Sequence, residues 1–476
     1  MPRRSYNIAM VSDFFYPQPG GVESHIYQLS TKLIDRGHKV IIVTHAYGKR
    51  SGVRYLTNGL KVYYVPFAVI YRNAIFPTVW SLFPIFRNIM IRERIEIVHG
   101  HAALSAMAHE AILHGRTMGL RAVYTDHSLF GFADIGSIFA NKLLKFCLSD
   151  VDHVICVSHT CKENTVLRAS LDPLMVSVIP NALVSASFQP KKLTGKPLRP
   201  SDAITIVVIS RLYYNKGTDL LTAAIPRILE EHPNTRFIIA GDGPKAIDLQ
   251  QMIEQNVLQD RVEMLGAIRH EEVCDVLARG HIYLHPSLTE AFGTAIVEAA
   301  SCGLLVVSTR VGGIPEVLPP DMTVFANPDE DDLVAATGRA IVRMRAGEVR
   351  TELFHEQIKS YYSWVNVAAR TERVYDGITG EIGEAEFYGT DTRPDTRSRI
   401  PSHAMIDRLK RYYGCGVWAG KLFCVVVAID YLLYVFLEWW FPREHIDFAT
   451  DWPRKLQPRE DSVVSGEEEE VAAWDD

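Results

Sequence analysis

The chain has 476 residues, more than one hydrophobic core usually organises, so its length favours two domains. Its 47% hydrophobic and 22% charged residues describe an ordinary folded protein. The net charge of -6 argues against a nucleic-acid partner, because no basic excess is available to neutralise phosphates.

The cysteines and the N-terminus indicate the compartment. None of the seven cysteines forms a Cys-x-x-Cys pair, and several lie in apolar runs, where a free thiol behaves as a small hydrophobic side chain. This pattern favours a reducing environment. The first residues are basic, but the following run is broken by Ser12 and Asp13 and lacks the apolar core of a signal peptide. The N-terminal bulk is therefore expected on the cytosolic side.

The first part of the chain alternates strands and helices. Residues 8–12 and 40–44 are predicted as buried parallel strands, and residues 22–36 between them as a helix that Gly37 ends. The remaining strands of this series are predicted at residues 61–65, 97–99, 122–125, 153–157 and 176–179.

Glycines and histidines follow the strand ends of this first series. Gly20 and Gly21 open the first helix and would present bare amides to a phosphate. They are not a G-x-G-x-x-G motif, which counts against a nicotinamide or flavin cofactor. His127 follows another strand end and has the right place for polar contact with a ligand, although a lone histidine is more often structural. His99 and His101 also flank a strand end, and for them too a structural role is the alternative to contact with a ligand.

A Pro- and Lys-rich stretch at residues 189–202 is predicted as a linker to a second α/β series. The strands of that series are predicted at residues 204–209, 235–240, 262–265, 282–285 and 305–308. We expect two doubly wound domains, at residues 1–195 and 196–380, with the carboxyl ends of their strands and hence their ligand sites at the cleft between them.

Two loops of the second series suit an anion. Arg211 and Lys216 follow its first strand and could clamp a diphosphate, although either one alone could be a solvated loop residue. Gly241 and Gly243 allow a tight bend and close ligand approach after the next strand, which is a weak signal by itself. The turn at residues 312–316 has the composition of a structural turn before a helix.

Glu290 and Glu298 flank the start of a helix predicted at residues 294–301. Unsatisfied amides at a helix N-terminus favour an anion such as a diphosphate, and carboxylates accept hydrogen bonds from sugar and ribose hydroxyls. The amides concerned belong to Phe292, Gly293, Thr294 and Ala295. Together they suit a nucleotide-sugar. The alternative is a helix with one glutamate in its first turn that compensates the helix dipole and a second glutamate in an ion pair.

No metal site is expected. A metal-dependent transferase would more typically carry an Asp-x-Asp motif near the nucleotide, and the cleft segments contain none. Arg211 and Lys216 would supply the positive charge instead.

After a linker at residues 381–414, residues 415–441 are predicted to span a membrane. This segment is apolar apart from Lys421, Asp430 and Glu438, and two tryptophans end it like an interfacial belt. Asp430 would be costly in mid-membrane, which makes it a candidate contact to a partner helix. The alternative is a buried or interfacial amphipathic helix.

The charges around this segment predict its orientation. Positive residues precede it at Arg408, Lys410 and Arg411, so the N-terminal bulk is expected in the cytosol and the tail, residues 442–476, in the lumen. The acidic end of the tail is typical of a solvated, disordered segment.

Taken together, the glycine pair, the basic pair, the glycine turn and the spaced glutamates resemble the retaining glycosyltransferases of family 4 from about residue 8 to 376. That resemblance implies the GT-B fold, in which two Rossmann-like domains face a central cleft. It also implies that Glu298 holds the ribose hydroxyls, that Glu290 contacts the donor sugar, and that Arg211 and Lys216 bind the diphosphate. The family's histidine near the anomeric centre would match His127.

A closer resemblance covers residues 13–25, 125–131 and 287–293 and the single C-terminal apolar span. These stretches resemble the branch of the family that transfers N-acetylglucosamine to phosphatidylinositol, the first step of glycosylphosphatidylinositol (GPI) anchor synthesis. The resemblance implies UDP-GlcNAc as donor, phosphatidylinositol as acceptor, no metal or other cofactor, and a multisubunit complex in the endoplasmic reticulum membrane.

Two other functions stay open at this point. A transferase of the same family could use a dolichol-linked or soluble sugar as acceptor. The apolar span and the aromatic stretch at residues 65–90 favour a lipid, although most of that stretch is more typical of core packing. A non-catalytic scaffold subunit could also have kept the fold, against which the intact basic and acidic positions argue.

Overall fold

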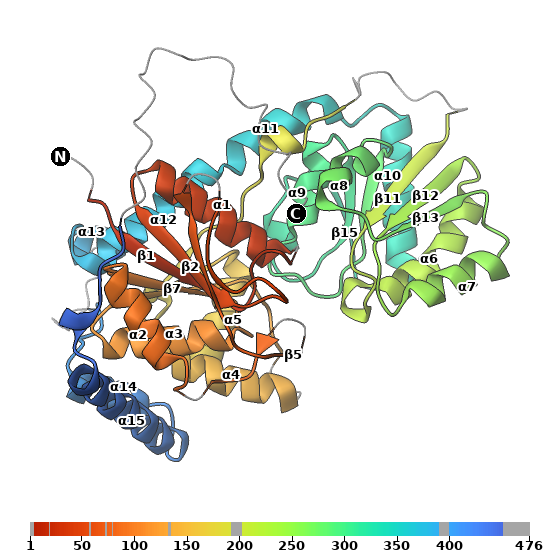
Figure 1. Cartoon of the computed structure of the whole chain (residues 1–476). Coiled ribbons are helices and arrows are strands. Elements are labelled where there is room, and N and C mark those ends of the chain that lie inside the picture. Colours follow the sequence, from red (N-terminus) through yellow and green to blue (C-terminus); the bar gives the residue numbers. More distant parts are fainter. Residues whose placement is uncertain are drawn as a thin grey trace, which may run out of the picture.

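The computed structural model describes residues 4–450 except 19, 57–58, 72–73, 79, 132–134, 192–201 and 390–398. Two mainly parallel sheets, each flanked by helices, form an N-terminal and a C-terminal lobe (Figure 1). Most of the predicted linker at 189–202 and of the predicted tail at 442–476 lies outside the described residues.

The N-terminal lobe is built on an eight-stranded sheet in the order β10-β9-β8-β7-β1-β2-β4-β3, antiparallel only between β3 and β4. Its central strands are buried along almost their whole length because helices cover both faces, and β1 and β2 are mainly apolar. The short edge strand β3 escaped prediction, since all four of its residues are exposed. The strands are β1 (Asn7–Val11), β2 (Lys39–His45), β3 (Gly52–Tyr55), β4 (Lys61–Val65), β7 (Ile97–His101), β8 (Arg121–Asp126), β9 (His153–Cys156) and β10 (Val176–Val178); β5 (Val69–Tyr71) and β6 (Ala74–Ile75) form a separate hairpin.

Helices on both sides bury this sheet. On one face α1 packs beside α12, which returns to the N-terminal lobe after the second sheet is complete, and α2 and α3 lie on the other face (Figure 1). The helices are α1 (Gly21–Asp35), α2 (Phe83–Arg92), α3 (Ala106–Thr117), α4 (Ile135–Leu148), α5 (His159–Ala169) and α12 (Trp364–Thr379).

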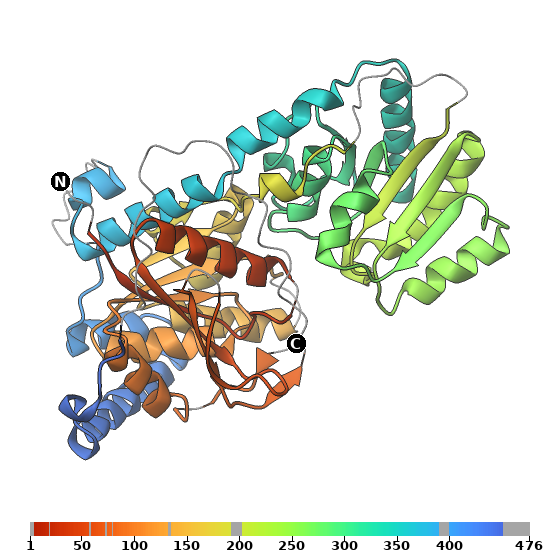
Figure 2. The same cartoon turned by 45° about the horizontal axis from the view of Figure 1, so that its top comes forward.

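The C-terminal lobe has a six-stranded, wholly parallel sheet in the order β13-β12-β11-β14-β15-β16 (Figure 2). Its strands are β11 (Ile204–Ile209), β12 (Thr235–Ala240), β13 (Val262–Gly266), β14 (Ile282–His285), β15 (Leu305–Thr309) and β16 (Thr323–Ala326). Its helices are α6 (Thr218–Glu231), α7 (Ala246–Gln255), α8 (His270–Leu277), α9 (Thr294–Ser301), α10 (Glu330–Arg345) and α11 (Phe354–Tyr361).

The strand order of this sheet positions the site. It reverses between β11 and β14, and ligands of doubly wound sheets bind outside the carboxyl ends of the strands at such a point. The loops that leave β11 and β14 there carry Arg211, Lys216 and Glu290.

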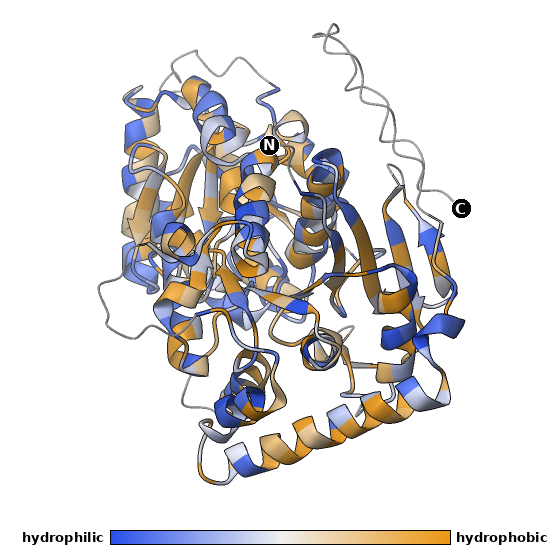
Figure 3. Cartoon of the chain, turned by 90° about the vertical axis from the view of Figure 1, so that its left-hand side faces the viewer, coloured by the Kyte–Doolittle hydropathy of each residue, from blue (hydrophilic) through white to orange (hydrophobic). Residues whose placement is uncertain are grey.

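The C-terminal segment folds back on the N-terminal lobe as α13 (Glu384–Tyr388), α14 (Met405–Tyr413) and α15 (Ala419–Trp440). The predicted linker at 381–414 thus contains helical structure. Among the described residues, α15 is the helix long and apolar enough to cross a membrane, and it lies along the bottom edge of the protein in Figure 3.

Asp430 was expected to contact a helix of a partner protein, but in the structure it contacts α3 of its own chain. Its carboxylate is fully buried and lies 2.7 Å from Nδ1 of His114, and it also accepts a hydrogen bond from the Thr117 hydroxyl. His114 and Thr117 stand three residues apart on α3 and therefore face α15 together. The carboxylate is bound within its own chain.

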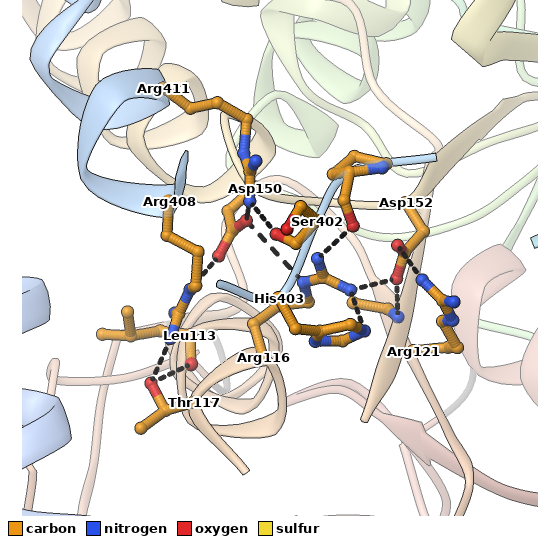
Figure 4. Close-up of polar contacts among 12 residues, drawn as sticks. Leu113, Arg116, Thr117, Arg121, Asp150, Asp152, Ser402, His403, Arg408 and Arg411 are labelled. Atoms are coloured by element: carbon orange, nitrogen blue, oxygen red, sulfur yellow. Dashed lines mark hydrogen bonds and ion pairs between the residues drawn. The ribbon is translucent and has the colours of Figure 1, made fainter. Parts of the chain in front are cut away.

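Two of the positive charges expected beside a membrane are used inside the protein. Arg408 is buried and donates to Asp150 at 2.6 Å, and Arg411 donates to the same carboxylate (Figure 4). Nearby, Arg116 of α3 donates to Asp152 at 2.6 Å. The carboxylates of Asp150 and Asp152 are buried, so the arginines neutralise charge that would otherwise stand unpaired. Lys410 remains exposed.

Replacement of Arg408 by alanine is expected to destabilise the N-terminal lobe by about 1–3 kcal/mol, because the buried carboxylate of Asp150 loses one charged donor and keeps Arg411. The matched control is Lys410→Ala on the same helix, which should change stability by no more than about 0.5 kcal/mol. Urea unfolding of the purified chain in detergent measures both. Equal effects of the two substitutions would contradict the assigned role of the ion pair.

Candidate functional site

Lys216 and Glu290, expected on different loops of one cleft, are in direct contact. Lys216 Nζ donates to the Glu290 carboxylate, which also accepts from the Ser287 hydroxyl at 3.1 Å and lies 3.3 Å from Nε2 of His285. Burial raises the pKa of Glu290, but the hydrogen bond from His285 and the charge of Lys216 together bring that pKa down to about 2. Glu290 is therefore an anion at neutral pH and holds Lys216 in place.

Arg211 is exposed at the end of β11 and acts across the cleft on the start of α1. Burial raises the pKa of Glu23, and the positive charge of Arg211 opposes that shift. The carboxylate of Glu23 folds over Gly20, where an added Cβ would come within 2.2 Å of it. The charge of the basic loop in one lobe thus acts on the carboxylate that covers the start of α1 in the other.

The glycine turn after β12 supports the basic loop. Gly241 has φ 138°, and a Cβ there would lie 1.9 Å from the carbonyl oxygen of Ser210; at Gly243 it would lie 2.3 Å from that of Leu212. The Leu212 amide in turn donates to the Asp242 carbonyl at 2.9 Å. Both glycines are needed for this backbone packing, which fixes the segment that carries Arg211.

The predicted helix at residues 294–301 is α9. Gly293 precedes it with φ 84°, a left-handed conformation that favours glycine, and no side chain caps the first amides. Phe292 is buried with its ring 5.6 Å from that of Tyr362, so only its backbone is available to a ligand. The amides from Phe292 to Thr294 thus stand at the start of a helix that no side chain caps, which is where an anion is expected to bind.

Glu298 lies in the second turn of α9 and is half-buried. Burial alone raises its pKa to about 7. The ion pair considered as the alternative from sequence belongs to Glu290 instead. Hydroxyl groups of a ligand would stabilise the charged form of this carboxylate, because they donate hydrogen bonds to it.

His127 belongs to a cluster of imidazoles on the N-terminal lobe. Its Nε2 lies 3.4 Å from Nδ1 of His101, and its ring lies 4.6 Å from that of His25, which itself contacts Asn181 at 2.8 Å. Burial lowers the pKa of His25 to about 4 and the pKa values of His101 and His127 well below their usual range. All three are neutral at pH 7, so His127 is suited to hydrogen bonding rather than to carrying charge.

The same cluster is a candidate metal site. One ligand atom from each of His25, His101 and His127 lies within 4.8 Å of the others, a spacing that could hold a metal ion. His99 stands apart from it: both ring nitrogens are engaged at 2.7 Å, one with the Tyr375 hydroxyl and one with that of Thr125. This fits the structural role considered for His99.

The two lobes touch beside the site through groups that the sequence did not single out. The Ser158 hydroxyl donates to the Ala291 carbonyl at 2.6 Å, and the carboxylate of Glu316 accepts from the amides of His159 at 2.6 Å and Thr160 at 2.8 Å. The Gly313 amide donates to the Glu290 carbonyl at 3.0 Å. The turn at 312–316 therefore has the structural role expected of it and also holds Glu290.

Sequence motifs could not have revealed Ser158 or His25. Ser158 is an ordinary helix N-cap, and His25 is a single histidine inside a helix. Their roles arise only from contacts between distant segments.

Comparisons with known proteins agree with this architecture. The family described as "PIGA (GPI anchor biosynthesis)" matches residues 45–134, and "Glycosyl transferases group 1" matches residues 191–342. The phosphatidylinositol N-acetylglucosaminyltransferase gpi3 subunit of Schizosaccharomyces pombe is 63% identical over 93% of this chain and 92% of its own length. One subunit of the human phosphatidylinositol N-acetylglucosaminyltransferase is 51% identical over 94% of this chain and 88% of its own length.

Solved structures agree on the fold. Sucrose-phosphate synthase from Thermosynechococcus elongatus aligns with a TM-score of 0.65 at 20% identity, covering 80% of this chain and all of its own. Anabaena Alr3699/HepE in complex with UDP and glucose aligns with a TM-score of 0.60 at 18% identity, covering 78% of this chain and 99% of its own. The predicted GT-B fold is confirmed, and the chain is a glycosyltransferase that belongs to the GPI3 family of phosphatidylinositol N-acetylglucosaminyltransferase subunits.

Proposed function

We propose that this chain is the catalytic subunit that transfers N-acetylglucosamine from UDP-GlcNAc to phosphatidylinositol with retention of configuration, the first step of GPI-anchor synthesis. The observation that carries the proposal is the contact between Lys216 and Glu290 beside the uncapped start of α9. A cation, a fixed carboxylate and open amides at one sheet edge suit a sugar diphosphate. A scaffold subunit would have no need to keep them together.

In this proposal the donor lies along the C-terminal lobe. Its diphosphate contacts Arg211, Lys216 and the amides from Phe292 to Thr294, its ribose hydroxyls donate to Glu298, and a hydroxyl of its sugar donates to Glu290. Arg211 and Lys216 stabilise the negative charge that develops on the departing UDP.

The acceptor approaches from the N-terminal lobe. An inositol hydroxyl attacks the anomeric carbon on the face that UDP leaves, and the departing phosphate takes up its proton, so no carboxylate nucleophile is required. His127, as a neutral imidazole, hydrogen-bonds the sugar near the anomeric centre. Gly21, where no atom lies within 4 Å of an added Cβ, lets the backbone of the N-terminal lobe come close to the bound substrates, whereas Gly20 accommodates the carboxylate of Glu23.

The test is transfer of labelled sugar to phosphatidylinositol in membranes that carry this chain. The donors are UDP-GlcNAc, UDP-Glc and GDP-Man, offered separately. Product from UDP-GlcNAc alone is the expected result. Product from another donor, or labelling of a dolichol-linked or soluble sugar instead of phosphatidylinositol, would contradict it.

Transfer is expected to survive removal of divalent cations, because Arg211 and Lys216 supply the positive charge at the diphosphate. The measurement is the initial rate after dialysis against EDTA, with and without added Mg²⁺, Mn²⁺ or Zn²⁺. A rate that is lost on dialysis and restored by one of these ions would contradict the proposal and would direct attention to His25, His101 and His127.

The names of the relatives describe subunits, which indicates a multisubunit complex, and α15 is compatible with membrane association. We propose the endoplasmic reticulum membrane as the location, with both lobes in the cytosol and the tail in the lumen. A crossing α15 must leave α3 and uncover Asp430, whereas a helix lying in the membrane plane keeps both contacts. An N-glycosylation acceptor added after Asp476 is glycosylated in the first arrangement and unmodified in the second.

A further inference from the structure

The outer face of α4 carries a stripe of exposed apolar side chains. Phe139 is 72% exposed, Ile138 45% and Leu143 43%, while Leu144 and Leu148 on the opposite face are buried in the core. Residues four apart on a helix lie on the same face, so Phe139 and Leu143 form one surface. Large apolar side chains gathered in this way mark a contact site more often than residues scattered singly.

Positive charge is interleaved with this stripe. Lys142 and Lys145 line a hollow of about 230 Å³ together with Ile138 and the exposed Leu167 of α5. Lys145 reaches across the hollow to donate to the Ser170 hydroxyl at 3.0 Å. Apolar side chains with lysines beside them are typical of a helix at a lipid surface, where lysines attract anionic headgroups and apolar groups enter the boundary of the acyl chains.

The stripe continues into the helix that is the candidate membrane segment. The ring of Phe146 on α4 lies 4.7 Å from that of Phe423, in the second turn of α15, and 5.2 Å from that of Tyr412 on α14. Trp418, at the start of α15, is 82% exposed. In the packed arrangement of α15, which a helix lying in the membrane plane keeps, its N-terminal end is therefore beside α4.

The stripe is also close to the candidate site along the chain. His127 directly follows β8, and α4 begins eight residues later. The side-chain amide of Asn141 on α4 donates to the Gly131 carbonyl at 3.1 Å, four residues after His127. A bilayer against α4 would therefore lie beside the loop that follows His127, and a lipid acceptor would bring its headgroup there while its acyl chains stay in the membrane.

We propose that the outer face of α4, comprising Ile138, Phe139, Lys142, Leu143 and Lys145, is a membrane-contact surface for an anionic bilayer. It acts in addition to α15 and holds the cleft at the height of the lipid headgroups. This inference rests on the proposed function, because it assumes an acceptor embedded in a membrane.

The test uses the full chain in its complex, reconstituted into vesicles of phosphatidylcholine and phosphatidylserine. The variant Phe139→Ser/Leu143→Ser is compared with wild type on two acceptors, long-chain phosphatidylinositol in the vesicles and a soluble dioctanoyl form. We expect the rate of transfer to the embedded acceptor to fall about tenfold or more, because the substitutions remove apolar surface from the contact with the membrane. The rate on the soluble acceptor should be unchanged. The matched control is Ile247→Ser/Val342→Ser, which removes two exposed apolar side chains from the C-terminal lobe.

The lysines provide a second and independent measurement. Lys142→Glu/Lys145→Glu should abolish the stimulation of transfer by phosphatidylserine while leaving the rate on the soluble acceptor intact. The proposal would be overturned if all variants had equal rates on both acceptors, or if a variant lost the same activity on both. It would also be overturned if a variant lost partner subunits from the purified complex, because the stripe would then be a protein contact. If wild type transfers to neither acceptor, the proposed function itself fails.

Discussion

Lys216→Ala is expected to lower the turnover of sugar transfer by on the order of 100- to 1000-fold, the effect of removing one charge that acts on the departing group. The loss should appear in kcat more than in KM, because the negative charge on the diphosphate is greatest in the transition state. The measurement is steady-state transfer from UDP-GlcNAc to phosphatidylinositol. Unchanged turnover would refute the role assigned to Lys216.

A control is needed because Lys216 also binds Glu290. Lys245→Ala is the matched substitution: Lys245 lies on the same lobe and is paired at 2.8 Å with both Asp219 and Asp248, yet it has no part in the proposed mechanism. It should leave turnover unchanged. The double variant Lys216→Ala/Glu290→Gln tests whether the unpaired carboxylate contributes, since any fall in stability of the single variant should diminish in the double one.

Glu298→Gln is expected to raise KM for UDP-GlcNAc at pH 8 and to flatten its pH dependence. The carboxylate accepts from two ribose hydroxyls in the proposed complex, whereas an amide offers one acceptor and introduces a donor. In the wild type, whose Glu298 has a pKa of about 7, donor binding should weaken as the pH falls from 8 to 6. KM measured across this range checks the prediction, and identical pH profiles for wild type and variant would contradict it.

The raised pKa of Glu298 also predicts how the stability of the ligand-free protein depends on pH. Stability should fall as the pH rises, whereas donor binding should strengthen. Burial raises the pKa of Glu298, so between its ordinary pKa and about 7 the folded protein binds a proton that the unfolded chain has released. This contribution to stability is present at low pH and is lost as the pH rises through 7. Thermal unfolding from pH 5 to 8 without nucleotide should therefore show a steeper decline for wild type than for Glu298→Gln.

The second sheet was the most predictable part of the fold. The strands β11, β12 and β14 and the helix α9 begin and end at the predicted residues, because apolar runs bounded by polar turns mark them. The missed strands lack that signal: β3 is exposed throughout, β5 and β6 are three and two residues long, and β16 lies at the edge of its sheet. Helix α14 was not predicted because it lies in a polar stretch whose arginines were interpreted as charges flanking a membrane segment. One of these arginines, Arg408, instead forms a tertiary contact with Asp150.

The candidate site could be predicted as a set of residues but not as a set of contacts. The ends of predicted strands located Arg211, Lys216, His127 and Glu290, and the roles assigned to them remain predictions. The contact between Lys216 and Glu290 joins loops 74 residues apart, and the cluster around His127 joins three segments of the N-terminal lobe. Neither leaves a periodic pattern in the sequence.

The carboxylate of Glu316 has a consequence for motion. It belongs to the C-terminal lobe, yet it caps the first turn of α5 in the N-terminal lobe. Any hinge opening that separates the lobes at this point takes the acceptor away from the amides of His159 and Thr160, although Ser158 remains as the N-cap of the helix, at a cost of about 0.5–1.5 kcal/mol for each hydrogen bond lost. The turn that carries Glu316 also holds the Glu290 backbone through Gly313. Separation of the lobes would therefore also act on the turn that fixes the Glu290 backbone.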